Sequence, residues 1–115
     1  MIRVCFQLRI APDRIDAYRE RHAAVWPEML GEIAASGRRN YSLFLGSDGL
    51  LIGYYETEAV ADADSYLAAS EVAARWEAEM GEFFVGLDGR PDQGATALTE
   101  IFNLESQLRA VEGKN

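Results

Sequence analysis

Residues 2–10 alternate between apolar and polar side chains along the whole segment. Apolar side chains occupy the even positions, whereas arginine, cysteine and glutamine occupy the odd ones. A period of two is typical of a β-strand that buries one face. The pattern therefore predicts a first strand over residues 2–10.

A helical spacing begins after Pro12, which suits the first turn of a helix. Pro27 then interrupts this pattern, because it has no N–H to donate and disfavours helical geometry at Trp26. We expect a break there, with Pro27 starting a second helical piece that Gly37 ends as its C-cap. Side chains three or four positions apart form one stripe along this segment: Ile15, Tyr18, His22, Val25, Met29 and Ile33.

Two strand-like runs follow at residues 40–46 and 50–57. The three residues between them, Ser47-Asp48-Gly49, contain the Asp-Gly pair that is typical of a β-hairpin. Apolar or aromatic side chains occur on both faces of these strands. The pattern predicts a hairpin whose outer face also needs cover.

The sequence from residue 58 onward predicts two helices, a loop and a final strand. Residues 58–69 favour a helix, and Ser70 is suited to cap another one. Residues 85–97 are rich in glycine and polar side chains and predict a loop, before a last strand at residues 97–104. The polar tail over residues 105–115 is expected to be frayed or a short helix.

The element order β-α-β-β-α-β predicts an α+β fold of the ferredoxin-like type, with a four-stranded antiparallel sheet. In this arrangement the helices cover one face of the sheet, so a homodimer that buries the other face is expected. A chain of 115 residues suits a single domain. We assign that domain to residues 1–104 and treat residues 105–115 as a C-terminal tail.

Composition and charge argue against several classes of partner and site. The formal net charge of −8 argues against nucleic acid or an anionic membrane surface as a partner. No apolar run approaches the ~18 residues of a membrane helix, and the alternating N-terminus is unlike a signal peptide. We therefore expect a cytoplasmic protein. With one histidine and one cysteine, Cys5, no metal site is expected.

His22 is the side chain best suited to proton transfer near neutral pH. Tyr18 lies one helical turn earlier on the same face, so both side chains can reach one small molecule. A second interpretation stays open, in which His22 is a hydrogen-bonded core residue and Tyr18 only packs. Cys5 is expected to act as a small hydrophobic side chain in its strand.

The segment around His22 also carries a motif, Y-x-x-R-H-x-x-x-W-P-E, over residues 18–28. This motif resembles the L-rhamnose mutarotase family, and the resemblance covers about residues 1–104. Further matching segments are Asn40-Tyr41, Arg75-Trp76, Met80 and Glu100-Ile101-Phe102.

The resemblance implies a dimeric α/β barrel-type fold that interconverts the α and β anomers of a deoxy sugar without a cofactor. It implies that His22 is the proton donor and that Tyr18, Tyr41 and Trp76 contact the monosaccharide. The family usually has a second tryptophan at the next position, where this chain has Glu77, which we also expect to contact the sugar. Because this difference changes the sugar-facing wall, the choice of sugar stays open.

Mutarotation already proceeds in water, so one placed acid or base, worth roughly 10²–10⁴-fold, is adequate. A nearby carboxylate can serve as the opposing base or polarise the anomeric hydroxyl, and the sequence leaves Glu28, Glu77 and Asp92 as alternatives. Two rival functions also stay open. One is a monooxygenase-like enzyme of the dimeric α/β barrel group, in which the histidine binds haem. The other is a non-catalytic sugar-binding dimer.

Overall fold

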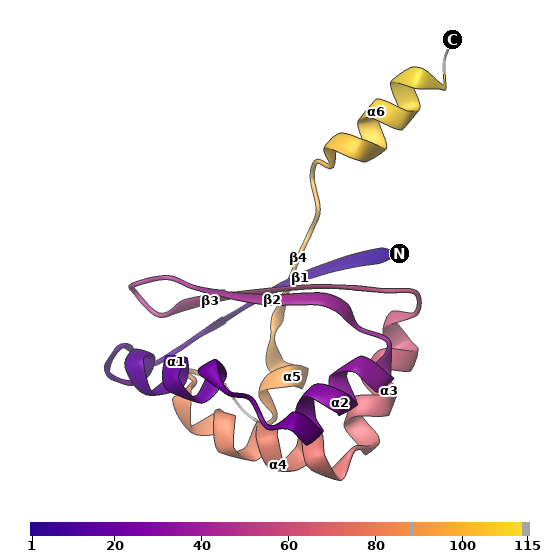
Figure 1. Cartoon of the computed structure of the whole chain (residues 1–115). Coiled ribbons are helices and arrows are strands. Elements are labelled where there is room, and N and C mark those ends of the chain that lie inside the picture. The colour runs from indigo at the N-terminus through magenta and orange to yellow at the C-terminus, as the bar shows by residue number, and fades with distance from the viewer. Residues whose placement is uncertain (88, 114–115) are drawn as a thin grey trace.

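A computed structural model describes residues 1–87 and 89–113 of the chain, and Figure 1 shows its layers. The sheet has four antiparallel strands in the order β2-β3-β1-β4. Their bounds are β1 Ile2–Arg9, β2 Arg39–Leu45, β3 Leu50–Thr57 and β4 Thr96–Leu98. The predicted α+β fold with a four-stranded antiparallel sheet is confirmed.

All helices before the last strand lie on one face of this sheet and leave the other face uncovered (Figure 1). Four of them form the covering layer: α1 Ile15–Ala23, α2 Pro27–Ser36, α3 Val60–Ala69 and α4 Glu71–Met80. A 3₁₀ turn at Pro12–Arg14 precedes α1, and another at Gly81–Phe83 follows α4. The core lies between the two layers and contains Ile10, Tyr18, Met29, Leu51, Leu67, Ala73, Trp76, Met80 and Phe83.

Local sequence signals set the ends of these helices. The predicted break is confirmed, because α1 ends at Ala23 and Pro27 is the first residue of α2. Gly37 ends α2 in the left-handed conformation, with φ of 97°. Ser70 caps α4, since its hydroxyl accepts a hydrogen bond from the backbone N–H of Ala73 at 3.1 Å.

The prediction for residues 85–104 was wrong in two places. A short helix, α5 (Pro91–Gly94), lies within the predicted loop, in which residue 88 is outside the described residues. The last strand spans Thr96–Leu98 instead of residues 97–104, and pairs with β1. Beyond Leu98 the chain leaves the edge of β1, so residues 99–103 have no neighbouring strand to complete their hydrogen bonds.

The C-terminal segment forms a helix, α6 (Leu104–Glu112), capped by the Asn103 side chain. Figure 1 shows α6 projecting from the sheet on the side opposite the other helices. The segment that leads to α6 is anchored by Glu100, whose carboxylate accepts two hydrogen bonds from Arg3, at 2.7 and 3.0 Å. The predicted tail therefore contains a helix, and residues 114–115 lie outside the described residues.

Candidate functional site

A cavity of about 580 Å³ lies between the covered face of the sheet and the helices. Its size falls within the ~300–1,000 Å³ of small-molecule sites. Aliphatic and aromatic side chains form most of its wall. The polar side chains that line it are Tyr18, His22, Arg38, Tyr41, Tyr55, Asp64, Glu77 and Asp92.

His22 lies at the cavity end formed by α1 and α4. Its ring lies against Tyr18, with centroids 4.2 Å apart, and meets the edge of Trp76 at 5.4 Å. Trp76 in turn packs against Trp26, at the break between α1 and α2, at 5.1 Å. Because the chain turns at Trp26 instead of continuing α1, this aromatic group closes one end of the cavity.

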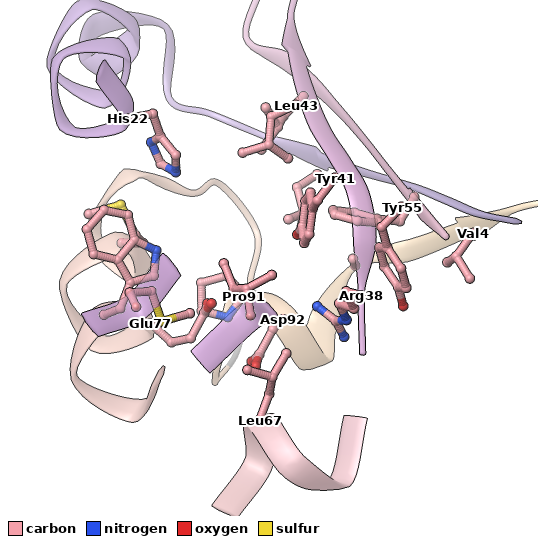
Figure 2. A pocket seen from close by; sticks show the side chains of 18 of the residues that line it. Val4, His22, Arg38, Tyr41, Leu43, Tyr55, Leu67, Glu77, Pro91 and Asp92 are labelled. Carbon is pink, nitrogen blue, oxygen red and sulfur yellow. The ribbon is translucent and has the colours of Figure 1, made fainter. Parts of the chain in front are cut away.

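The hydrogen bond of His22 determines which ring nitrogen can react. Nδ1 lies 3.0 Å from the backbone carbonyl oxygen of Tyr18. A carbonyl oxygen only accepts, so Nδ1 carries the proton and Nε2 of the neutral ring has a free lone pair. Burial lowers the pKa of His22 despite this hydrogen bond, so the neutral form dominates at pH 7. Figure 2 shows the ring directed into the cavity.

A β-bulge directs Arg38 and Tyr41 toward the same cavity. The pairing register shifts between Arg39 and Ser42, and Asn40 has a positive φ of 50°. In a regular strand, residues three apart point to opposite faces, but the extra residue of a bulge reverses this relation. The Arg38 guanidinium lies over the Tyr55 ring at 4.3 Å, and its Nη2 donates to Asp64 at 2.8 Å.

The floor of the cavity is the inner face of β1, β2 and β3. Phe6 lies 6.3 Å from both Tyr41 and Tyr55, between ring centroids. Gly53 pairs with Phe6 across the sheet, and a Cβ atom there would overlap the Phe6 ring. The absence of a side chain at Gly53 therefore allows the ring to lie across β3.

Glu77 and Asp92 supply two carboxyl groups with different surroundings. Both oxygens of Asp92 accept hydrogen bonds from Arg90, at 3.0 Å from Nε and 2.8 Å from Nη2. Glu77 forms no salt bridge with the described residues. Burial raises the pKa of Glu77 to about 7, the carboxylate of Asp92 adds to this rise, and Arg90 opposes it.

All five predicted site residues line this one cavity: Tyr18, His22, Tyr41, Trp76 and Glu77. Asp92 also lines it, whereas Glu28 is exposed on α2 and does not. Cys5 lies on the uncovered face of the sheet and is only partly buried. The sequence did not identify Arg38 as a cavity residue, because its inward position depends on a bulge that no local motif signals.

Residues 1–87 and 89–113 contain neither a metal-binding cluster nor a helix that could span a membrane. No cluster of three or more His, Cys, Asp or Glu side chains there could hold a metal ion. Within the same residues, no helix is both long enough and apolar enough to cross a membrane.

Comparison with known proteins identifies the family. The family model of L-rhamnose mutarotase matches residues 3–104. The L-rhamnose mutarotase of Pectobacterium atrosepticum is 33% identical over 108 residues, which cover 91% of this chain and all of the relative. That of Oceanobacillus iheyensis is 34% identical over 107 residues, with the same two coverages.

Solved structures agree on the fold. An L-rhamnose mutarotase from Formosa agariphila superposes with a TM-score of 0.73 at 23% identity, covering 90% of this chain and 99% of that one. A putative antibiotic biosynthesis monooxygenase from Nitrosomonas europaea gives a TM-score of 0.59 at 12% identity, covering 89% and 100%. The fold is thus shared with monooxygenase-type proteins, but the sequence match is specific. The chain belongs to the L-rhamnose mutarotase family, whose members are carbohydrate isomerases that interconvert α and β anomers.

Proposed function

We propose that this protein interconverts the α and β anomers of L-rhamnose or a related 6-deoxy sugar by acid/base opening of the sugar ring. Family membership supports the reaction, and the names of the relatives support the sugar. The reaction transfers protons and needs no change of oxidation state. The side chains of the cavity are therefore sufficient for it.

One observation carries this proposal. The neutral imidazole of His22 has its Nδ1 bound to the Tyr18 carbonyl, and the ring is directed into an aromatic-walled cavity. A free Nε2 lone pair in such a position can accept the proton of an anomeric hydroxyl. The resulting imidazolium donates a proton when the ring closes. His22 is therefore neutral at the start of the catalytic cycle and a proton donor at its end, in agreement with the proton-donor role that the family resemblance implies.

The other cavity residues have binding roles in this proposal. The buried phenols of Tyr18 and Tyr41 have a raised pKa because of burial, so both stay protonated and can donate hydrogen bonds to sugar hydroxyls. The Trp76 ring can cover the apolar C–H surface of the sugar or its methyl group. Where the family usually has a tryptophan, Glu77 places a carboxyl group in the cavity wall. This group can bind another sugar hydroxyl.

The decisive experiment is NMR saturation transfer between the anomeric protons of L-rhamnose. The protein should accelerate exchange above the rate in buffer, and heat-denatured protein should not. A panel of 6-deoxy sugars then defines the preferred one. Exchange no faster than in buffer for every sugar of the panel would contradict the proposal.

We also propose that two copies form a homodimer through the uncovered face of the sheet. Phe44 and Leu98 leave apolar surface on that face, at 62% and 39% exposure. The projecting segment adds Ile101 and Phe102, which are 93% and 59% exposed. A second copy stacked on this face would meet the segment, because α6 projects from the same side (Figure 1).

We also propose the bounds of the domain and the location of the protein in the cell. We assign the mutarotase domain to residues 1–104 and regard residues 105–115 as a tail, which is supported by the family match over residues 3–104. We place the protein in the cytoplasm, because its cysteine, Cys5, is free and a reducing compartment keeps thiols in this state.

A further inference from the structure

Opening of a sugar ring moves two protons, so a second group beside His22 can assist it, and three carboxyl groups line the cavity: Asp64, Glu77 and Asp92. This inference rests on the proposed mutarotase function. Glu28 drops out of the three sequence candidates, because it is exposed on α2 and does not line the cavity. Asp64 also lines the cavity, but its Oδ1 accepts a hydrogen bond from Arg38 at 2.8 Å. We therefore compare Asp92 with Glu77.

Asp92 is held as an ionised partner of Arg90. Its two carboxylate oxygens accept separate hydrogen bonds from Nε and Nη2 of the guanidinium. This bidentate geometry is the strong form of an arginine–carboxylate pair. Both oxygens of Asp92 bind the guanidinium, so Asp92 is less suited to proton transfer than a carboxyl group without such a partner.

Glu77 has the opposite properties. It lies one residue after Trp76 on α4, lines the same cavity as His22, and has no salt bridge within the described part of the chain. The nearest cations are already engaged: Arg90 binds Asp92, and Arg38 binds Asp64. Figure 2 shows His22 above and Glu77 below on the left of the cavity, with Tyr41 and Arg38 across from them.

The environment of Glu77 favours a carboxyl that gains and loses a proton near neutral pH. Burial and the Asp92 carboxylate favour its neutral form, whereas Arg90, the backbone N–H of Asp92, and Arg38 favour the charged form. The ionisable groups that line the cavity around it come from several elements: Tyr18 and His22 on α1, Arg38 and Tyr41 at β2, Tyr55 on β3, Asp64 on α3, and Asp92 on α5.

We propose that Glu77 is the catalytic residue that exchanges a proton with the ring oxygen, opposite His22 at the anomeric hydroxyl. During opening, Nε2 of His22 takes the hydroxyl proton while the Glu77 carboxyl protonates the ring oxygen. The bond between the anomeric carbon and the ring oxygen breaks, which leaves an aldehyde and a free hydroxyl.

Ring closure reverses these transfers on the other face. After rotation about the bond next to the aldehyde, the free hydroxyl attacks the carbonyl carbon and gives its proton to the Glu77 carboxylate. The imidazolium of His22 protonates the new anomeric oxygen. Both side chains end in their starting states, so the cycle needs no further reactant.

The test compares Glu77→Gln with the parent protein in the saturation-transfer assay from pH 5 to 9. Glutamine keeps the size of the side chain and an oxygen that accepts hydrogen bonds, but it cannot act as an acid. At saturating L-rhamnose, we expect exchange to fall by about 10²-fold or more. The half-saturating sugar concentration should change little, and Glu77→Asp should recover part of the rate.

The pH profile separates a catalytic role from a structural one. The parent rate should fall as pH rises through about 7, where Glu77 loses its proton, and this fall should be absent in Glu77→Gln. Glu79→Gln is the matched control, because Glu79 lies on the same helix, pairs with Arg21 at 3.6 Å and lies outside the cavity.

The outcomes are distinct. An active parent with an unchanged rate and pH profile in Glu77→Gln would overturn the role of Glu77 and leave the mutarotase function intact. A change confined to the half-saturating concentration would also overturn it, because it would mean that Glu77 only binds the sugar. A parent that accelerates no sugar would overturn the mutarotase function itself.

Discussion

The Nδ1 atom of His22 lies 3.0 Å from the carbonyl oxygen of Tyr18, one turn earlier in α1. Both groups lie within α1, and the Trp76 ring of α4 packs against the imidazole with the centroids 5.4 Å apart. The hydrogen bond holds the imidazole in one tautomer. The direction of Nε2 is therefore set by α1 and by its packing against α4.

His22→Ala should remove most of the anomer exchange while leaving the fold intact. The loss should be about 10²–10⁴-fold, the usual contribution of one acid/base group. Saturation transfer measures the rate, and circular dichroism checks the fold. Arg19→Ala, an exposed position on the same helix, is the control that should keep the parental rate. Equal rates in both variants would contradict a catalytic His22.

Tyr18→Phe should slow exchange less than the histidine substitution. The ring still packs against His22, Phe83 and Phe84, so only the hydroxyl is lost. One hydrogen bond is worth about 1 kcal/mol, which corresponds to roughly fivefold in binding or turnover. Rates over a series of L-rhamnose concentrations measure the effect. A loss as large as that of His22→Ala would mean that the hydroxyl takes part in proton transfer.

Glu77→Gln should stabilise the fold at high pH only. The pKa of Glu77 is raised from 4.5 to about 7, so the folded state binds this proton more tightly than the unfolded chain does. The free energy of unfolding of the parent therefore falls as pH rises from 4.5 to about 7, and then stays level with respect to this group.

A neutral glutamine does not incur this loss, so the variant should be more stable than the parent by about 2 kcal/mol at pH 8. At pH 4, where the parent carboxyl is protonated in both states, the two proteins should differ little. Urea unfolding at both pH values measures the difference. The same difference at both pH values would argue against a buried, neutral Glu77.

Gly53→Ala should destabilise the protein by about 1–3 kcal/mol, the usual cost of overpacking. The added methyl would overlap the Phe6 ring, which must then leave the cavity floor. Gly81→Ala is the control, because its Cβ meets no atom within 4 Å. Thermal unfolding of both variants tests the difference. Equal melting temperatures would show that Phe6 has room to move.

Ile101→Asp should weaken the proposed homodimer. This side chain is 93% exposed in one copy and lies in the segment that would meet a second copy. Light scattering after size exclusion should give a dimer for the parent and a smaller mass for the variant. Leu30→Asp, on α2 away from the uncovered face, should leave the mass unchanged. A monomeric parent would refute the dimer.

The sequence predicted those features that depend on neighbouring residues. Pro27, Gly37 and Ser70 each act through the backbone within a few positions, and each determines a helix end. The motif around His22 was also sufficient to predict one end of the cavity. These features could be predicted because their causes lie within one or two turns of chain.

Features that depend on distant residues could not be predicted in this way. Arg38 faces the cavity because of a bulge and because Asp64 pairs with it from α3. The choice of Glu77 over Asp92 depends on the position of Arg90. The last strand was predicted too long, because its alternation does not show where its neighbour in the sheet ends.

The short strand β4, Thr96–Leu98, connects Ala95 and Ala97 in the cavity wall directly to the projecting segment. Its pairing with β1 extends over three residues only. Whatever restrains the projecting segment therefore also restrains one wall of the sugar cavity. In a homodimer, assembly and sugar binding would be thermodynamically linked, so the affinity for sugar would decline on dilution and sugar binding would in turn favour the assembled form.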